Sequence, residues 1–248
     1  MLTLLGLLLS NAHAGCDTPR RVRVVTLNAW GLPAPIAKDR KLRLPRIERW
    51  LEKRDADISG LQEVWRGARP LLSDGVVWSA SPADTGLAVS SRHPVTHLVQ
   101  HTFASGRGFD RIKSKGVLEV ELEVQGEPLW VAVTHLQSGP GERNARVRAA
   151  QVDELLELVE PGRPTVLLGD FNFYTGELTD ALSHQRLVDA GFVDVAAAAG
   201  VRTATYPGGE HRFDRIYARS RCTHTVDAEV IEDSGLSDHH AVEVELRL

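Results

Sequence analysis

The chain has 248 residues, of which 42% are hydrophobic and 25% charged, values that fit a globular protein and exclude a fibrous or disordered one. The length fits one large domain or two small ones, and because no linker separates the polar motifs described below, we expect one domain over residues 15–248. The formal net charge of −4 gives no global positive field, which disfavours long nucleic acid as a partner, although a local basic patch could still bind phosphate.

Residues 1–14 have the pattern of a secretory signal. Leu2 to Leu9 form a short apolar core, and Ala12-His13-Ala14 has the small-x-small form of a cleavage site. The run is too short to span a bilayer, so we expect no integral membrane segment in the mature chain. No Lys or Arg precedes the apolar core, and the alternative is a buried N-terminal helix. Export, to a periplasm or outside the cell, is the expected localisation.

Two cysteines, Cys16 and Cys222, occur in the chain. In an oxidising compartment they would pair and tie the mature N-terminus to a late strand. The alternative is two unrelated thiols, and both alternatives stand because the sequence does not supply the Cα separation that a disulfide requires.

The N-terminal half alternates short strands with helical segments. Apolar alternation bounded by Gly, Pro and Ser predicts strands over 21–28, 57–63, 76–79, 86–91 and 95–102. Leu44, Ile47 and Leu51 recur at helical spacing and predict a helix over 41–53, with Pro45 in its first turn, where proline is tolerated. A second helix is expected over 64–72.

The C-terminal half opens with a basic, glycine-containing loop over 106–115. Strands are expected over 117–124, 129–136, 165–168, 212–218, 225–231 and 241–246, and helices over 143–159 and about 178–190. Strands with one solvent-exposed face indicate antiparallel sheets. Two sheets packed face to face, each covered by helices, would bury both apolar faces. No internal sequence repeat is visible.

Short polar motifs follow most of the hydrophobic runs, and a strand that ends in a polar residue places it at the rim of a sheet, where ligands bind. The motifs read Leu27-Asn28-Ala29-Trp30-Gly31, Leu61-Gln62-Glu63, Thr134-His135-Leu136, Gly169-Asp170-Phe171-Asn172, Asp214-Arg215-Ile216-Tyr217 and Ser237-Asp238-His239-His240. Six such rims indicate one site assembled by the fold. Hard oxygen ligands with two imidazoles suit magnesium-assisted attack on a phosphate ester.

Glu63, Asn28 and Asp238 are the predicted metal ligands. A lone carboxylate at a strand end is usually a solvated charge, but Mg²⁺ keeps several waters, so these three residues are a sufficient protein shell. Mn²⁺ is the alternative ion.

Asp170 and Asn172 lie two residues apart after a core strand, so on an extended segment their side chains would point the same way. The carboxylate would then hold a water or metal and the amide would donate to a phosphate oxygen. The alternative is an Asx-type turn that caps the next helix.

His239 is the predicted active imidazole, with Asp214 as the carboxylate that orients it. His240, its neighbour on the strand, should point the other way and serve packing. His135, at another strand end, is predicted to donate to the non-bridging phosphate oxygens. Lys115 is the predicted substrate-binding member of a basic cluster that also holds Arg107, Arg111 and Lys113, and the alternative for this cluster is a solvated turn.

Gln62-Glu63, Gly169-Asp170-Phe171-Asn172 and Ser237-Asp238-His239 together resemble the endonuclease/exonuclease/phosphatase superfamily, over about residues 22–248. The resemblance implies a four-layer α/β/β/α sandwich of two mainly antiparallel sheets flanked by helices, and magnesium dependence. The branch most similar is that of the neutral sphingomyelinases, on the motifs Leu27-Asn28-Ala29-Trp30-Gly31-Leu32-Pro33, Gln62-Glu63-Val64-Trp65, Ser114-Lys115-Gly116-Val117-Leu118 and His239-His240-Ala241-Val242.

That similarity implies roles for the motif residues. Glu63 would ligate magnesium, Asn28 would help at the metal or phosphate, and Asp238 would support the metal side. Asp170 and Asn172 would position the attacking water and the phosphate, His135 would stabilise the transition state, and His239 with Asp214 would form the acid/base pair. One departure counts against membrane insertion, and so against sphingomyelin. The aromatic hairpin that secreted bacterial sphingomyelinases usually carry is missing, because residues 219–237 contain no Trp, Phe or Tyr.

The sequence therefore predicts a monomeric, magnesium-dependent phosphodiesterase in which His239 activates a water for in-line attack. Its leading substrate is a phospholipid headgroup such as that of sphingomyelin. A secreted nuclease acting on DNA or RNA is the alternative. A non-catalytic binding protein on the same scaffold is disfavoured, because Glu63, Asp170 and His239 are all present.

Overall fold

The computed structural model describes residues 20–72, 75–79, 81–220, 223–233 and 235–248. The predicted signal (residues 1–14) and both cysteines, Cys16 and Cys222, lie outside this part of the chain. No helix in the described ranges has the length and apolar character needed to cross a membrane.

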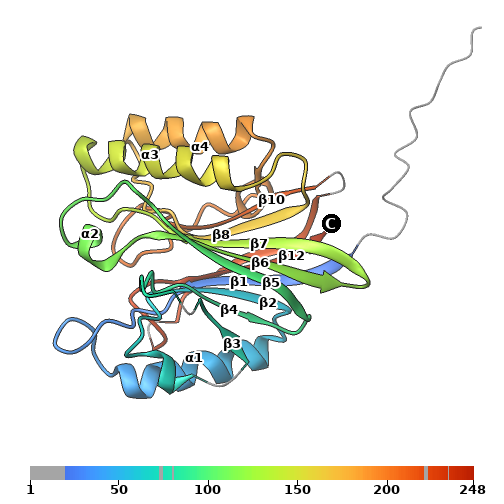
Figure 1. Ribbon diagram of the computed structural model, residues 1–248, viewed down its shortest axis with the longest axis horizontal. Helices are drawn as coiled ribbons and strands as arrows, with labels where there is room; N and C mark the ends of the chain where they lie inside the picture. Colours follow the sequence, from blue (N-terminus) through green and yellow to red (C-terminus); the bar gives the residue numbers. More distant parts are fainter. Residues whose placement is uncertain (1–19, 73–74, 80, 221–222, 234) are drawn as a thin grey trace, which may run out of the picture.

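Two six-stranded sheets form the centre of the molecule (Figure 1). The first has the order β11-β12-β1-β2-β4-β3 and consists of β1 (Arg21–Asn28), β2 (Ile58–Gln62), β3 (Val76–Val77), β4 (Ala88–Ser91), β11 (His224–Ile231) and β12 (Ala241–Arg247). The second has the order β5-β6-β7-β8-β10-β9 and consists of β5 (Val95–Thr102), β6 (Gly116–Val124), β7 (Glu127–His135), β8 (Thr165–Asp170), β9 (Val193–Asp194) and β10 (Asp214–Arg219).

Helices cover the outer face of each sheet (Figure 1). Those on the outer faces are α1 (Arg40–Arg54), α3 (Glu142–Leu158) and α4 (Leu178–Asp189). Two short helices lie elsewhere: α2 (Phe109–Lys113) is at one side of the molecule, and α5 (Val195–Ala198) places Val195 and Ala196 in the core between the sheets. Helix α1 packs on the first sheet, whereas α3 and α4 pack on the second. The predicted four-layer α/β/β/α sandwich is therefore confirmed.

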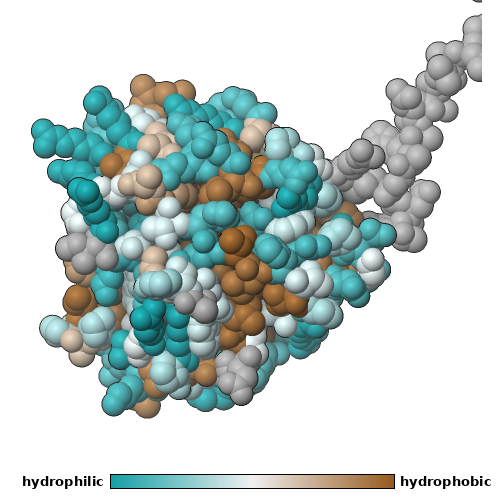
Figure 2. Space-filling view, viewed as in Figure 1, coloured by the Kyte–Doolittle hydropathy of each residue, from teal (hydrophilic) through white to brown (hydrophobic). Residues whose placement is uncertain are grey.

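Three apolar clusters hold these layers together. Strand residues point alternately to the two faces of a sheet, so on β8 Val166 and Leu168 join the cluster between the sheets while Leu167 joins the cluster under α3 and α4. A third cluster lies between α1 and the first sheet, where Leu44 and Ile47 are fully buried. Apolar side chains reach the surface near the middle of the face seen in Figure 2. The partly buried Val77 of β3 and Leu98 of β5 pack against the central core.

The two sheets share one pairing pattern, although the sequence has no repeat. In each, a central parallel pair is flanked by antiparallel neighbours: β1 with β2 in the first sheet, and β7 with β8 in the second. A helix joins the two strands of each parallel pair, α1 in one and α3 in the other. The similarity of the halves is therefore one of structure alone.

Three local predictions need correction. Residues 64–72 form a loop with one 3-10 turn at Arg69–Leu71, because Gly67 and Pro70 interrupt a helix. The expected loop 106–115 contains α2. Pro45 is the sixth residue of α1 and lies beyond its first turn, because the helix begins at Arg40. The two-residue strand β9 and the four-residue helix α5 are too short to show a periodicity, and the sequence did not predict them.

Candidate active site

The polar motifs converge on a cavity of about 240 Å³ at one edge of the two sheets. The parallel register aligns the ends of β1 with β2 and of β7 with β8, which brings their terminal residues to the same edge. The cavity is lined by Asn28, Glu63, His135, Ser138, Gly139, Asp170, Asn172, Tyr174, Tyr206, Phe213, Asp238 and His239. Seven of the nine residues that the sequence singled out are in this lining; Asp214 and Lys115 are not.

Glycines inside two motifs allow strands to approach one another closely. A Cβ on Gly169 would lie 1.9 Å from the carbonyl oxygen of Thr134, and Gly169 has φ +147°, in the range that favours glycine. A Cβ on Gly31 would lie 2.1 Å from the carbonyl oxygen of Glu63. Gly169 therefore lets β8 approach β7 closely just before Asp170, and Gly31 lets the segment after β1 approach Glu63 after β2.

Asp214 lies behind His239 and orients it. Its Oδ2 is 2.8 Å from His239 Nδ1, and both side chains are buried. Although burial alone would lower it, the carboxylates of Asp214, Asp170 and Asp238 raise the pKa of His239 to about 10. Because Nδ1 is occupied by Asp214, Nε2 faces the cavity, 3.9 Å from Asp170 Oδ2. This is the arrangement of an imidazole that exchanges protons through Nε2.

Asp170 is the electrostatic centre of the cavity. Its Oδ2 accepts from the Asn28 amide at 3.1 Å and lies 3.3 Å from His135 Nε2. Burial alone would raise the pKa of Asp170, but His135, His239 and Lys115 together hold it below its ordinary value. Asp170 is therefore a carboxylate throughout the neutral range.

Asn172 lines the cavity, but its backbone conformation is not the extended one that was predicted. Its φ of +51° is left-handed, so the segment after β8 is not extended. Asp170 Oδ1 accepts from the Asn172 backbone N–H at 3.0 Å, which makes the Asx-type turn that was the alternative prediction. This turn does not cap a helix, since α4 begins only at Leu178. The turn and the cavity position therefore occur together, and the Asn172 amide donates to the Leu136 carbonyl at 3.3 Å.

Glu63, Asn28 and Asp238 fit a divalent cation. The Asn28 amide donates to Glu63 Oε1 at 3.2 Å, but Glu63 Oε2 is buried without a hydrogen-bond partner among the described residues. An unpartnered buried carboxylate oxygen is costly unless a cation or water satisfies it. Burial raises the pKa of Asp238, and the charge of Glu63 adds to this rise. Two carboxylates that repel each other in a small cavity are hard oxygen donors of the kind that Mg²⁺ takes.

A second group of potential ligands, Asp170, Asp214 and His239, brings ligand atoms within 4.8 Å of one another. Here His239 Nδ1 pairs with Asp214 Oδ2, and Asn28 donates to Asp170. Asp214 Oδ1 is buried without a partner among the described residues, but Asp214 lies behind His239 and does not line the cavity. The chemistry of this group therefore suits proton transfer, whereas the Glu63 side of the cavity suits a cation.

Lys115 lies behind the cavity wall rather than in it. Its ammonium is 3.6 Å from Asp110 Oδ1 on α2, and its side chain is 3% exposed. Burial lowers the pKa of Lys115. Asp110 also accepts from the backbone N–H and hydroxyl of Ser138, each at 2.7 Å. Ser138 lines the cavity, so Asp110 connects α2 and Lys115 to the site.

Aromatic residues that sequence reasoning missed form one wall of the cavity. Tyr206 packs edge-on to His239 with ring centroids 5.0 Å apart, and Phe213 contacts both Tyr174 and Tyr206 at 4.8 and 5.7 Å. Tyr174 and Phe213 lie next to the Asn172 and Asp214 motifs in the sequence, and this proximity could have identified them as cavity residues. Tyr206 follows no strand, so nothing in the sequence indicated its position.

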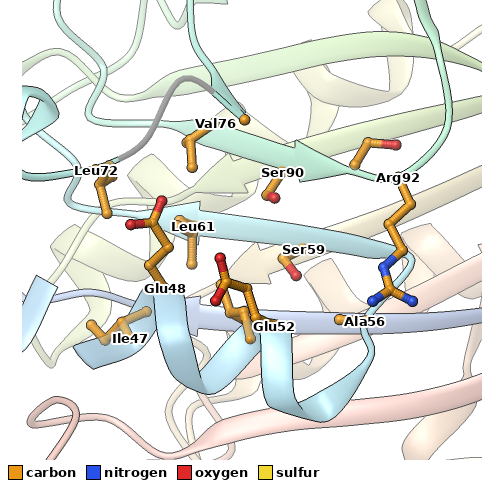
Figure 3. A pocket seen from close by; sticks show the side chains of 13 residues that line it. Ile47, Glu48, Glu52, Ala56, Ser59, Leu61, Leu72, Val76, Ser90 and Arg92 are labelled. Atoms are coloured by element: carbon orange, nitrogen blue, oxygen red, sulfur yellow. The ribbon is translucent and has the colours of Figure 1, made fainter. Parts of the chain in front are cut away.

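A different cavity of about 180 Å³ lies between α1 and the strands β2 and β4 of the first sheet (Figure 3). Its lining includes Glu48 and Glu52 of α1, Ser59 of β2, and Ser90 beside Arg92. Leu61 of the Leu61-Gln62-Glu63 motif lines it, but none of the nine predicted site residues does, so it is not the candidate active site.

The model of one family matches residues 25–239, and its description is endonuclease/exonuclease/phosphatase family. This chain belongs to that family. The prediction made from the motifs is therefore confirmed, and the match includes every predicted site residue, from Asn28 to His239.

Curated relatives within the endonuclease/exonuclease/phosphatase family carry the names of lipid phosphoesterases. A phospholipase C of Staphylococcus aureus is 32% identical over 128 residues, which cover 47% of this chain and 39% of the relative. A putative neutral sphingomyelinase of Caenorhabditis elegans is 30% identical over 200 residues, covering 69% of this chain and 46% of the relative. The chain thus spans less than half the length of these relatives.

Solved structures share the family fold. An endonuclease/exonuclease/phosphatase protein from Beutenbergia cavernae has a TM-score of 0.73 at 22% identity, covering 92% of this chain and 72% of that one. A mutant beta toxin from Staphylococcus aureus, solved with bound magnesium ions, has a TM-score of 0.67 at 18% identity, covering 90% of this chain and 98% of that one.

Proposed function

We propose that this protein is a divalent-metal-dependent phosphodiesterase that hydrolyses its substrate with an activated water. The observation that carries the proposal is the His239–Asp214 pair beside Asp170, across one cavity from the unpartnered Oε2 of Glu63. This arrangement places a proton-transfer group and a cation-binding group in one small cavity, and metal-assisted hydrolysis of a phosphodiester uses both.

Glu63 would hold the metal, with Asn28 and Asp238 beside it. Mg²⁺ is the proposed ion and Mn²⁺ the alternative; the donors are all oxygens, and one structural neighbour was solved with magnesium ions. When bound, the ion supplies positive charge to a phosphoryl oxygen and to the leaving group.

The chain's own residues would handle the protons and the phosphate. In its neutral form His239 takes a proton from water through Nε2, and the surrounding carboxylates stabilise the imidazolium that this produces. Because those carboxylates raise the pKa of His239 to about 10, the positive charge of a cation bound in the same cavity would be needed to favour the neutral imidazole at neutral pH. Asp170 would hold the water within reach of His239 Nε2, because Asp170 Oδ2 lies 3.9 Å from that nitrogen. Asn172 and His135 donate to the equatorial oxygens; such a donor typically contributes about 100-fold or more in rate.

The proposed substrate is a phospholipid headgroup ester such as sphingomyelin. The names of the curated relatives support it: phospholipase C and putative neutral sphingomyelinase. We also propose export, on the pattern of residues 1–14 alone.

The test is magnesium-dependent release of phosphocholine from sphingomyelin, run beside cleavage of plasmid DNA. His239→Ala should lose about 100- to 10,000-fold in turnover, the usual contribution of a general base. His240→Ala is the matched control, because it removes an adjacent imidazole that does not line the cavity. A folded His239→Ala variant with most of its activity would refute the assignment. Cleavage of DNA alone would move the protein to the nucleases.

A further inference from the structure

The loop between β1 and α1 exposes a continuous apolar segment. Residues 32–37 read Leu-Pro-Ala-Pro-Ile-Ala, with no polar side chain, and residues 33–36 are all exposed. Ile36 is 55% exposed. The loop projects from the body of the protein (Figure 1). Single exposed apolar residues are ordinary on a protein surface, but a projecting run of them marks a contact surface.

Two more exposed apolar side chains stand at the beginnings of α1 and α2. Leu42 is 69% exposed and Phe109 is 55% exposed, among the largest values for apolar residues in the described part of the chain. With the loop they form two lobes: residues 33–36 and Leu42 beside the first sheet, and Phe109 beside the second.

Both lobes are anchored to the residues that form the cavity. The Arg43 guanidinium donates to the carbonyl oxygens of Ala29 and Trp30, directly after Asn28, and to that of Lys38 at the far end of the loop. On the other lobe Asp110, next to Phe109, holds Ser138 of the cavity wall. The apolar tips therefore lie at the end of the molecule where the cavity is.

Positive charge surrounds these tips in a chain that is acidic overall. Residues 36–46 contain five basic residues and one acidic residue, whereas the whole chain has a net charge of −4. Lys38 and Lys41 are exposed beside the first lobe, and Arg107 and Arg111 beside the second. Apolar tips with basic residues at their base are the combination that binds the surface of an anionic bilayer.

We propose that these two lobes dock the protein on a lipid bilayer that carries anionic headgroups, with Ile36, Leu42 and Phe109 entering the interface and the cavity turned toward the lipid. This docking proposal rests on the proposed function, because a phospholipid substrate would be reached in a bilayer rather than in solution. Nucleic acid would use the same basic residues, but it gives no reason to expose residues 33–36, Leu42 and Phe109.

Binding is measured by cosedimentation with phosphatidylcholine vesicles, with and without about a third phosphatidylserine, a strongly anionic surface. Wild type should bind the anionic vesicles and release them as salt rises from about 0.1 to 1 M, where screening shortens from about 10 to 3 Å. Ile36→Ser, Leu42→Ser and Phe109→Ser should each weaken partitioning about tenfold. Lys41→Gln should weaken it about fivefold, on anionic vesicles only.

Leu182→Ser is the matched control, because Leu182 is 53% exposed on α4, outside both lobes, and this variant should bind as wild type does. Unchanged binding in the three apolar variants, or equal loss in Leu182→Ser, would overturn the proposal. The proposal would also be overturned if Lys41→Gln weakened binding to plasmid DNA while none of the variants changed binding to vesicles.

Activity separates this proposal from the proposed function. The three apolar variants should hydrolyse a soluble phosphodiester, bis(p-nitrophenyl) phosphate, at the wild-type rate and should lose activity only on vesicles. If wild type binds vesicles but hydrolyses neither substrate, the proposed function fails and the docking surface stands. If wild type is active on the soluble ester but does not bind vesicles, the docking surface fails alone.

Discussion

The Asp214–His239 contact joins the two sheets of the sandwich, because Asp214 begins β10 of the second sheet and His239 lies two residues before β12 of the first. Apolar residues between the sheets, among them Ile216 of β10 and Val242 of β12, fix the distance across which the pair forms. The pairing of carboxylate and imidazole therefore depends on the central core.

Asp214→Asn tests the pair with little change in volume. The amide can still contact Nδ1, but it cannot stabilise an imidazolium, so we expect turnover of a phosphodiester to fall by about 100- to 10,000-fold. The pKa of His239 should also fall from about 10, because its first carboxylate partner is lost. Both are measurable, by steady-state kinetics and by NMR titration of the imidazole. An unchanged rate in a folded variant would contradict the assigned pairing.

Magnesium should stabilise the folded protein through Glu63. A ligand that binds only the folded state at about 100 times its dissociation constant adds about 2.7 kcal/mol to the free energy of unfolding. Glu63→Gln keeps the shape but removes the charge at the unpartnered oxygen, so its thermal midpoint should respond much less to magnesium. Glu48→Gln, in the other cavity, is the control and should respond as wild type does. An equal response in Glu63→Gln would place the metal elsewhere.

The sequence allowed most of the framework to be predicted, because strands with one wet face alternate and end in polar motifs. That pattern identified Asn28, Glu63, His135 and Asp170 as residues at one edge of the sheets, and the register of the two parallel pairs aligns them there.

What the sequence did not reveal depends on contacts between distant segments. Lys115 follows the basic residues of its cluster in sequence, yet it is buried against Asp110, which a count of charges does not show. Arg148 falls on the inner side of α3 and is fully buried, although an arginine at that position is ordinarily a surface residue. Tyr206 enters the cavity from a segment with no periodicity at all.

Arg148 should be essential to stability. Its guanidinium forms two hydrogen bonds of 2.7 Å with Asp180 and also donates to the carbonyl oxygens of Gln137 and Gly139, beside the cavity. Arg148→Met leaves the Asp180 charge buried without its partner, which should lower the free energy of unfolding by about 3–5 kcal/mol. Arg186→Met removes an exposed pair with Asp153 and should cost about 1 kcal/mol or less. Urea denaturation compares the two, and similar losses would show that burial does not set the difference.

The pH dependence of stability should carry the signature of Asp194. Its carboxylate contacts Arg212 at 3.1 Å and Arg215 at 3.0 Å and accepts from the Ala197 N–H at the start of α5. Burial alone would raise the pKa of Asp194, but these cations and hydrogen bonds hold it below the ordinary 3.8. Because the folded-state pKa is the lower one, the stabilisation is fully present above the unfolded-state value and is lost as the pH falls through the folded-state value.

Asp194→Asn removes this contribution and leaves two partly buried arginines, Arg212 and Arg215, without their carboxylate. The variant should be less stable than wild type by about 3 kcal/mol or more at neutral pH. The difference should then narrow as the pH drops below about 4, because the Asp194 carboxylate takes up a proton first in the unfolded wild-type chain and only at lower pH in the folded protein. Urea unfolding of both proteins between about pH 7 and pH 3 measures this difference, with Asp153→Asn at an exposed pair as the control. A difference that stays constant across that range would show that the charge of Asp194 is not what stabilises the α5 end of the second sheet.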